Sequence, residues 1–362
     1  MELTVVADPL LNEYGSARPA ILIARELAKH HNVRLISPII SHDLYRGLRR
    51  LGIQPISLNK HFIFRNSSLV LLESWFRKLW ESPVPQFPDG RVEGVVLNFS
   101  NVSTSPCHFW YVQGPISRAI RSLGENLPAP YGVFSKVFGG LITRFDQQLI
   151  QRSVGHSKIV VANSAYTASL YRDFGVKVDT VIFPPIDLDV FRPVNNGGFD
   201  GDYVLTYFGK ETDYPVIKAV ADRGVRIKAF GSKIRNAPGW CTNHKNIEVL
   251  GWVDTQTLVR LYSNARFTIF PFLHEPFGYV PLESLACGTP VLTYRREGPS
   301  EVVTEETGWL VRDGGEMVRV AVKLWNLMGK EDDPMECRER ATLFDVRRVA
   351  EDWRTLIESL PS

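Results

Sequence analysis

Short apolar runs alternate with amphipathic stretches along most of this chain. Near the amino end, an apolar run at residues 2–7 precedes a stretch with helical spacing and a second run at residues 33–37. Strands that are buried on both faces give continuous apolar runs, and alternation with helical stretches is typical of parallel α/β sheets. The pattern therefore predicts an α/β protein. Its further predicted strands lie at residues 92–98, 107–112, 158–163, 203–208, 225–231, 247–253, 267–272 and 289–294.

The most informative of these units spans residues 266–291 and the strand that follows. An apolar, aromatic-rich run ends in a loop that carries Glu275, and a short helix comes next. Pro281 suits the first turn of that helix, because proline lacks only an N–H that has no helical partner there. Gly288 suits the position just past the helix, where a left-handed backbone is favoured. We place Glu283 in the first helical turn.

This loop has the features of a ligand site, because ligands of parallel sheets bind at the carboxyl ends of the strands. We expect the N–H groups of Phe277, Gly278, Tyr279 and Val280 to be free or nearly so, and such a helix start favours an anion such as phosphate. Glu283 would then accept hydrogen bonds from a ribose, and Glu275 from a second polyol. The alternative is that Glu283 is only a helix-start acid and Glu275 a solvated loop acid.

Composition excludes several other classes of protein. The chain has 362 residues, 44% of them hydrophobic and 22% charged, which fits a globular protein of two domains. Its net charge of +3 is too small to argue for nucleic acid. The four cysteines form no CxxC pair, so we expect reduced thiols and no zinc or redox site. We also expect no signal peptide, no membrane span, no metal and a cytoplasmic location.

The segment HEPFGYVPLESLACGTPV resembles the motif of retaining GT-B glycosyltransferases of family 4, in which two glutamates are separated by seven residues. Glu275 and Glu283 match the two glutamates. The resemblance implies two Rossmann-like domains that face each other across a cleft. It also implies that the carboxyl-terminal domain binds a UDP- or GDP-linked sugar as co-substrate, with no other cofactor, and that the amino-terminal domain binds the acceptor.

Other positions match the family less closely. Gly15 matches the glycine-rich loop after the first strand, and Gly209 and Lys210 match a turn that grips the donor diphosphate, although the second lysine of that turn is missing. Gln113 stands where relatives often carry a histidine that faces the donor sugar. Gly298 and Glu301 match a turn that borders the pocket, but Glu301 also suits a helix start.

The resemblance also suggests how the chain divides. We expect an amino-terminal domain at residues 1–190, a polar linker at 191–202 and a carboxyl-terminal domain at 203–343. Residues 344–362 have helical spacing and, as in GT-B enzymes, would return to the first domain. The aromatic and basic stretch at residues 61–80 fits either a buried helix or a face that touches the inner side of a membrane.

The expected function is transfer of a hexose, with retention of configuration, to a hydroxyl of a glycan, a lipid-linked acceptor or a small molecule. Glu275, Lys210 and Gln113 are the expected catalytic residues. The other expected donor-binding residues are Glu283, Phe277, Gly278, Tyr279, Val280, Gly209, Gly15 and Glu301. Two alternatives stay open: a sugar phosphorylase or nucleotide-sugar epimerase of the same fold, and a non-catalytic nucleotide-sugar-binding protein.

Overall fold

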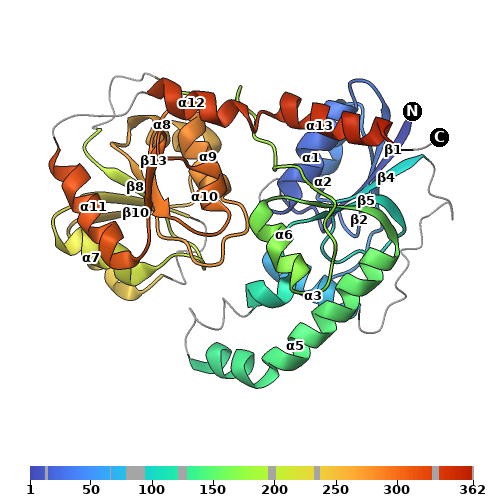
Figure 1. Cartoon of the computed structure of the whole chain (residues 1–362), viewed down its shortest axis with the longest axis horizontal. Coiled ribbons are helices and arrows are strands. Elements are labelled where there is room, and N and C mark those ends of the chain that lie inside the picture. The colour runs from blue at the N-terminus through green and yellow to red at the C-terminus, as the bar shows by residue number, and fades with distance from the viewer. Residues whose placement is uncertain are drawn as a thin grey trace. The chain divides into compact units, whose positions relative to one another are not determined.

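The computed structural model describes residues 1–12, 15–65, 67–78, 94–120, 129–194, 201–231, 237–327 and 334–360. The chain divides into two compact units. The first consists of residues 1–117, 140–185 and 346–362, and the second of residues 118–139 and 186–345. Each unit is built around one parallel sheet (Figure 1).

The sheet of the first unit has seven parallel strands in the order β3-β2-β1-β4-β5-β6-β7. The strands are β1 (Glu2–Val6), β2 (Asn32–Ser37), β3 (Gln54–Ser57), β4 (Val95–Asn98), β5 (Cys107–Val112), β6 (Ser157–Ala162) and β7 (Thr180–Val181). Its helices are α1 (Ala17–Leu27), α2 (His42–Arg50), α3 (Ser67–Arg77), α6 (Ala165–Arg172), α13 (Val346–Glu358) and the part of α5 (Ala129–Gly155) from residue 140 onward.

Helices cover both faces of this sheet. Neighbouring residues of one strand therefore pack into different hydrophobic cores. Leu3 and Val5 of β1 belong to one cluster, which α1 and α13 complete, whereas Val6 belongs to a second cluster with Tyr171 of α6. Alternation of side chains across a strand requires this division. The sheet is therefore buried on both sides, as the continuous apolar runs predicted.

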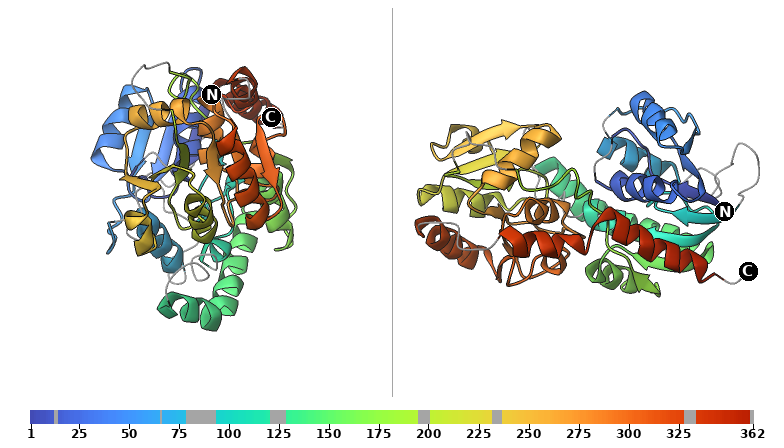
Figure 2. Two further views of the ribbon diagram at one scale, coloured as in Figure 1. Left: turned by 90° about the vertical axis from the view of Figure 1, so that its left-hand side faces the viewer. Right: turned by 90° about the horizontal axis from the view of Figure 1, so that it is seen from above.

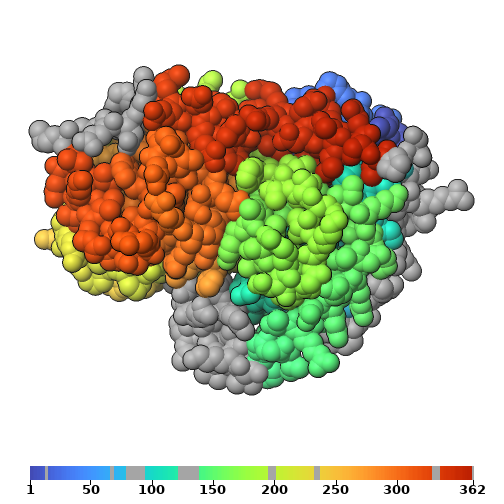
Figure 3. Space-filling model, in the orientation of Figure 1, coloured from blue at the N-terminus to red at the C-terminus, as the bar shows by residue number. Residues whose placement is uncertain are grey.

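The last helix, α13, lies beside α1 (Figures 1 and 2). The buried side chains of α13 include Val349, Trp353 and Ile357, which lie one helical turn apart. The outer face of α13, which carries Arg348 and Asp352, is exposed on the surface of the first unit (Figure 3). The helical spacing of this segment is thus confirmed.

The second unit has a six-stranded parallel sheet in the order β10-β9-β8-β11-β12-β13. Its strands are β8 (Val204–Tyr207), β9 (Ile227–Phe230), β10 (Ile247–Gly251), β11 (Thr268–Phe270), β12 (Val291–Tyr294) and β13 (Gly308–Val311). Its helices are α7 (Tyr214–Asp222), the 3-10 helix η2 (Gly239–Asn243), α8 (Thr255–Asn264), α9 (Tyr279–Ala286), α10 (Pro299–Val302), α11 (Gly314–Asn326) and α12 (Pro334–Thr342).

Several local signals in the sequence define the helix ends. Ser164 accepts a hydrogen bond from the N–H of Thr167, and Asp254 accepts one from Thr257, so each caps its helix. Gly288 follows α9 with a φ of 75°, which is the left-handed conformation predicted for it. Two edge strands, β3 and β13, were not predicted. Each has four residues and one neighbouring strand, so only a short apolar signal marks it.

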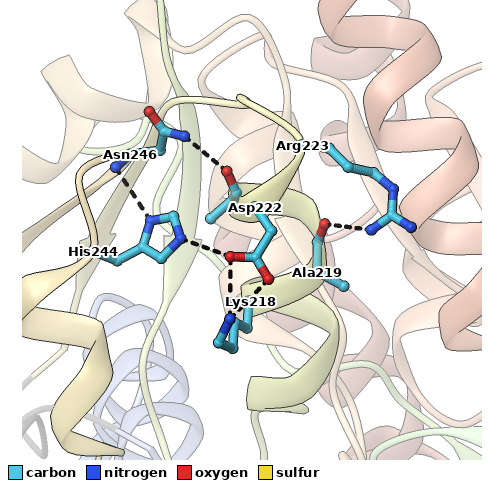
Figure 4. A network of polar contacts seen from close by, with 7 residues as sticks. Lys218, Ala219, Asp222, Arg223, His244 and Asn246 are labelled. Atoms are coloured by element: carbon cyan, nitrogen blue, oxygen red, sulfur yellow. Dashed lines mark hydrogen bonds and ion pairs between the residues drawn. The ribbon is translucent and has the colours of Figure 1, made fainter.

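A polar network braces the second unit at the edge where its strands begin (Figure 4). Asp222 at the end of α7 accepts from Lys218 at 2.8 Å and from Nε2 of His244 at 3.0 Å. Nδ1 of His244 accepts the backbone N–H of Asn246, so the proton of the neutral ring lies on Nε2. The network fixes the turn before β10, on the edge opposite the carboxyl ends of the strands.

Among the helices in the described residues, none combines the length and the apolar character that a membrane span needs.

Candidate functional site

The order of strands in the second unit reverses between β8 and β11, which are neighbours in the sheet but not in the sequence. Ligands of open α/β sheets bind at the carboxyl ends of the strands at such a point. The two loops that leave these strands are joined by backbone hydrogen bonds. The N–H of Leu273 donates to Glu211 at 2.8 Å, and the N–H of Asp213 donates to Pro271 at 2.8 Å. Lys210 and Glu275 therefore lie on two loops that form one surface.

Gly209 opens the turn after β8 and has no room for a side chain. A Cβ atom there would lie 2.2 Å from Cε1 of Tyr207. The hydroxyl of Thr212 closes the turn, because it accepts the N–H of Gly209 at 3.1 Å and donates to the carbonyl of Tyr207 at 2.9 Å. This turn presents Lys210, whose side chain is half-buried, at the edge of the sheet.

The loop that carries Glu275 packs against the loop after β12. The N–H of Glu275 donates to the carboxylate of Glu297 at 2.9 Å, and the N–H of Gly298 donates to the carbonyl of Glu275 at 3.1 Å. A Cβ at Gly298 would lie 2.3 Å from both Cα of Phe277 and the carbonyl oxygen of Pro276. Gly298 thus permits the close approach of two loops. Glu297 was not predicted, because its contact depends on a residue 22 positions away.

The expectation that the amides at the start of α9 are free or nearly so was wrong for two of the four. The carboxylate of Glu275 accepts the N–H of Gly278 at 3.1 Å and that of Phe277 at 3.3 Å. These donors follow Glu275 by two and three residues, a spacing at which a side-chain oxygen can reach a backbone N–H, as a capping side chain does. An anion at this helix start would therefore compete with Glu275 for two of the four amides.

Glu275 is half-buried among other charges. The pKa of Glu275 is raised to about 7, chiefly by burial and then by the nearby carboxylate of Glu211, while the hydrogen bonds from Phe277 and Gly278 and the charge of Lys210 limit this rise. The structure therefore brings together Glu275 and Lys210, two predicted residues, with Glu211, which sequence reasoning overlooked. The signal for Glu211 was its place directly after Lys210.

Glu283 lies in the second turn of α9, not in the first as expected, because the helix begins at Tyr279. Its side chain is buried, and it accepts a hydrogen bond from the hydroxyl of Tyr262 on α8 at 3.1 Å. Tyr279 and Val280 are half-buried in the first turn. The placement favours neither a solvated acid nor a first-turn acid. Glu283 is thus a buried carboxylate on the helix that follows β11, beside the strand-order reversal.

Glu301 lies in the first turn of α10, as a helix-start acid would. Its backbone carbonyl accepts a hydrogen bond from Arg340 of α12, and the carbonyl of Val302 accepts another from the same side chain at 3.0 Å. Arg338 of α12 similarly donates to the carbonyl of Ala286 at the end of α9 at 2.8 Å. Two arginines of α12 therefore satisfy the last carbonyls of the helices that follow the site loops.

Gly15 and Gln113 belong to the first unit, where strand order reverses between β1 and β4. Gly15 has a φ of 63°, a conformation that favours glycine. The side-chain nitrogen of Gln113 donates to the carbonyl oxygens of Phe99 at 3.0 Å and Ser16 at 3.1 Å. Both amide hydrogens are thus in use, which leaves Oε1 as the atom that a ligand could meet.

Two further polar residues, Asp8 and His108, lie in the first unit near its strand-order reversal and have structural contacts. The buried carboxylate of Asp8, at the end of β1, accepts hydrogen bonds from Ser100 and Asn101 and so holds the loop after β4. Burial raises the pKa of Asp8. His108 of β5 is packed in the sheet: its Nδ1 accepts the N–H of Val96 at 3.1 Å, and burial lowers its pKa.

The fold and the glutamate-bearing loop together define the class of protein. Residues 240–344 match the model of the family described as "Glycosyl transferases group 1". The solved structure of Anabaena HepE in complex with UDP and glucose is similar over 99% of both chains, with a TM-score of 0.69 and 14% identity. The chain therefore has the GT-B fold and carries a group 1 glycosyl transferase domain.

Particular relatives can be named for part of the chain. The α-1,3/1,6-mannosyltransferase alg-2 of Neurospora crassa is 38% identical over 92 residues, which are 24% of this chain and 20% of that protein. The GDP-mannose-dependent α-(1-6)-phosphatidylinositol dimannoside mannosyltransferase of Mycobacterium tuberculosis is 30% identical over 105 residues, or 29% and 28% of the two chains. The similarity thus spans less than a third of either relative.

Proposed function

We propose that this protein is a retaining glycosyltransferase that moves a hexose from a UDP- or GDP-linked donor to a hydroxyl acceptor. The observation that carries the proposal is the cluster of Lys210, Glu211 and Glu275 at the strand-order reversal of the second unit. The group 1 match over residues 240–344 and the names of the relatives support it. The first unit would bind the acceptor.

Each residue has a proposed part in the reaction. Lys210 would bind the donor diphosphate and offset charge on the leaving group. Glu275 would accept hydrogen bonds from sugar hydroxyls, and Glu283 from the ribose. The amides of Tyr279 and Val280 would contribute to the anion site. The oxygen of Gln113 would face the sugar, with Gly15, Gly209 and Glu301 at the edges of the pocket.

The proposed chemistry is a front-face displacement. The acceptor oxygen forms a bond with the anomeric carbon as the bond from that carbon to the phosphate oxygen breaks. The acceptor proton passes to the departing diphosphate, so that charge and atoms balance and no covalent enzyme intermediate forms. We favour this route because the double-displacement route needs a nucleophilic carboxylate beside the sugar, and Glu275 already accepts two backbone amides.

The proposal is tested by nucleotide binding and turnover. We expect one family among UDP-, GDP- and ADP-sugars to raise the melting temperature and to be slowly hydrolysed. Glu283→Ala should weaken the matching nucleotide about tenfold or more, because a hydrogen bond to a charged group is lost. Glu248→Ala, at an exposed carboxylate of β10, is the matched control. Unchanged affinity in Glu283→Ala would show the ribose assignment to be wrong.

The remaining outcomes separate the alternatives. Turnover that requires inorganic phosphate, or product that forms without an acceptor, would favour the phosphorylase or the epimerase. Nucleotide binding with no turnover on any acceptor would favour a binding protein. Absence of binding to every nucleotide would reject the site itself.

A contact with an anionic membrane surface is part of the proposal for the acceptor. Ile63 and Phe64 are 82% and 45% exposed, and their backbone N–H groups donate to Glu73 of α3 at 3.0–3.2 Å. The chain thus holds two large apolar side chains toward solvent beside exposed Arg65. Such a combination is typical of membrane-surface contacts.

We expect this segment to bind vesicles that contain anionic lipid and to release them at high salt. The double variant Ile63→Ser, Phe64→Ser should lower co-sedimentation several-fold, because the apolar contribution is lost. Leu51→Ser, at another exposed apolar residue of the first unit, should not. Equal sedimentation of both variants and the unaltered protein would reject the contact.

A further inference from the structure

Tyr207, the last residue of β8, has a ring that is held on several sides. Its ring lies edge-on to Phe230 at 5.4 Å and to Phe272 at 6.1 Å between centroids. Glycines at the ends of β8 and β9 leave space for it: a Cβ at Gly209 would lie 2.2 Å from Cε1, and one at Gly231 would lie 3.3 Å from Cε2. The two glycines therefore allow the ring to pack closely against both turns.

The hydroxyl of Tyr207 has a different environment from its ring. Among the described residues the hydroxyl has no hydrogen-bond partner, and the side chain is half-buried. Burial raises the pKa of Tyr207 well above its usual value, and the carboxylates of Glu211, Glu275 and Glu283 raise it further. The hydroxyl therefore keeps its proton at every working pH, so it can donate a hydrogen bond.

The charged side chains around Tyr207 carry more negative than positive charge, although the proposed ligand is itself an anion. Three carboxylates influence Tyr207, and Lys210 is the cation that lowers the pKa of Glu275. The turn after β8 lacks the second lysine that the resemblance led us to expect. A neutral O–H donor can bind a phosphate oxygen without the cost of burying a further charge.

We propose that the Tyr207 hydroxyl donates a hydrogen bond to the sugar-linked phosphate of the donor nucleotide and takes the part of the missing second cation. The inference rests on the proposed function, in which Glu275 meets the sugar and Glu283 the ribose. The diphosphate joins these two groups. The Tyr207 ring packs against Phe272, three residues before Glu275 on the loop after β11, which places the hydroxyl on the sugar side of the diphosphate.

The test is Tyr207→Phe, which removes the hydroxyl and keeps the ring. Affinity for UDP and GDP, and for the corresponding monophosphates, is measured by calorimetry on the full chain. For the base that binds, we expect diphosphate affinity to fall about tenfold, as for loss of a hydrogen bond to a charged group. Monophosphate affinity and the melting temperature should not change, because the monophosphate lacks the contacted group.

Tyr203→Phe is the matched control. Its hydroxyl donates to the carbonyl of Leu261 at 2.8 Å at the opposite end of β8, so its loss should lower the melting temperature without changing either affinity. Equal diphosphate affinity in Tyr207→Phe and the unaltered protein would overturn the inference and leave the proposed function intact. Equal loss for monophosphate and diphosphate would also overturn it. If the unaltered protein binds no nucleotide, the proposed function fails and the inference with it.

Discussion

Replacing Glu275 with glutamine is expected to make the protein more stable and nearly inactive. In the folded protein the pKa of Glu275 is raised from 4.5 to about 7, chiefly by burial and then by the charge of Glu211. Above pH 4.5 the carboxylate is therefore less favourable in the folded state than in the unfolded state. This destabilisation grows as the pH rises through about 7 and is then complete.

Glutamine carries no charge but offers an equivalent oxygen to the amides of Phe277 and Gly278. We expect Glu275→Gln to raise the free energy of unfolding by about 1–3 kcal/mol at pH 8 and by almost nothing at pH 4.5. Transfer should fall by about 10²-fold or more, because the charged acceptor for the sugar hydroxyls is lost. Urea unfolding at the two pH values and initial rates with a saturating donor would measure both effects.

Glu248→Gln is the control for this experiment, because Glu248 is an exposed carboxylate of β10. It should change neither stability nor rate. If Glu275→Gln kept its activity within about threefold, the proposed contact with the sugar would be wrong. If Glu275→Gln were no more stable than the unaltered protein at pH 8, the conclusion that the charge of Glu275 destabilises the fold would be wrong. Opposite effects on stability and activity are typical of functional sites.

Trp353→Ala is expected to destabilise the first unit by about 3–5 kcal/mol, as for other large aromatic side chains removed from a core. Trp353 is 1% exposed, and its ring lies 5.2 Å from that of Phe99 and 5.6 Å from that of Tyr111. Alanine would leave a cavity among these rings and loosen α13. Denaturant unfolding should show the loss, and hydrogen exchange should localise it to the first unit.

Thr355→Ala, at an exposed position of the same helix, should cost less than about 0.5 kcal/mol. Nucleotide binding by the second unit should persist in Trp353→Ala under conditions in which the first unit is still folded. If Trp353→Ala cost no more stability than Thr355→Ala, the conclusion that the rings of Trp353, Phe99 and Tyr111 stabilise the first unit would be wrong. Loss of hydrogen-exchange protection mainly in β8–β13 would contradict its location.

Much of the architecture could be predicted from the sequence, because its signals are local. Apolar runs indicated parallel strands, since strands buried on both faces need apolar side chains at successive positions. Ser164 and Asp254 could be recognised as caps, and Gly288 as a left-handed residue, because each depends on only a few neighbouring positions. The loop that carries Glu275 could be recognised for the same reason.

The chemistry of the site depended on contacts that no local pattern contains. The carboxylates of Glu211 and Glu275 belong to loops 64 positions apart, and only the adjacency of β8 and β11 brings them together. The burial of Glu283 depends on Tyr262 of another helix.

Gln113 is a similar case, because its amide hydrogens are used by Ser16 and Phe99, which are distant in sequence. The sequence by itself thus determined the class of fold and the location of the motif, through spacing and turn chemistry. Only the tertiary structure decided which charges interact and which donors remain for a ligand. The physical reason is that burial and pairing depend on neighbours in space, and the order of strands in the sheet determines those neighbours.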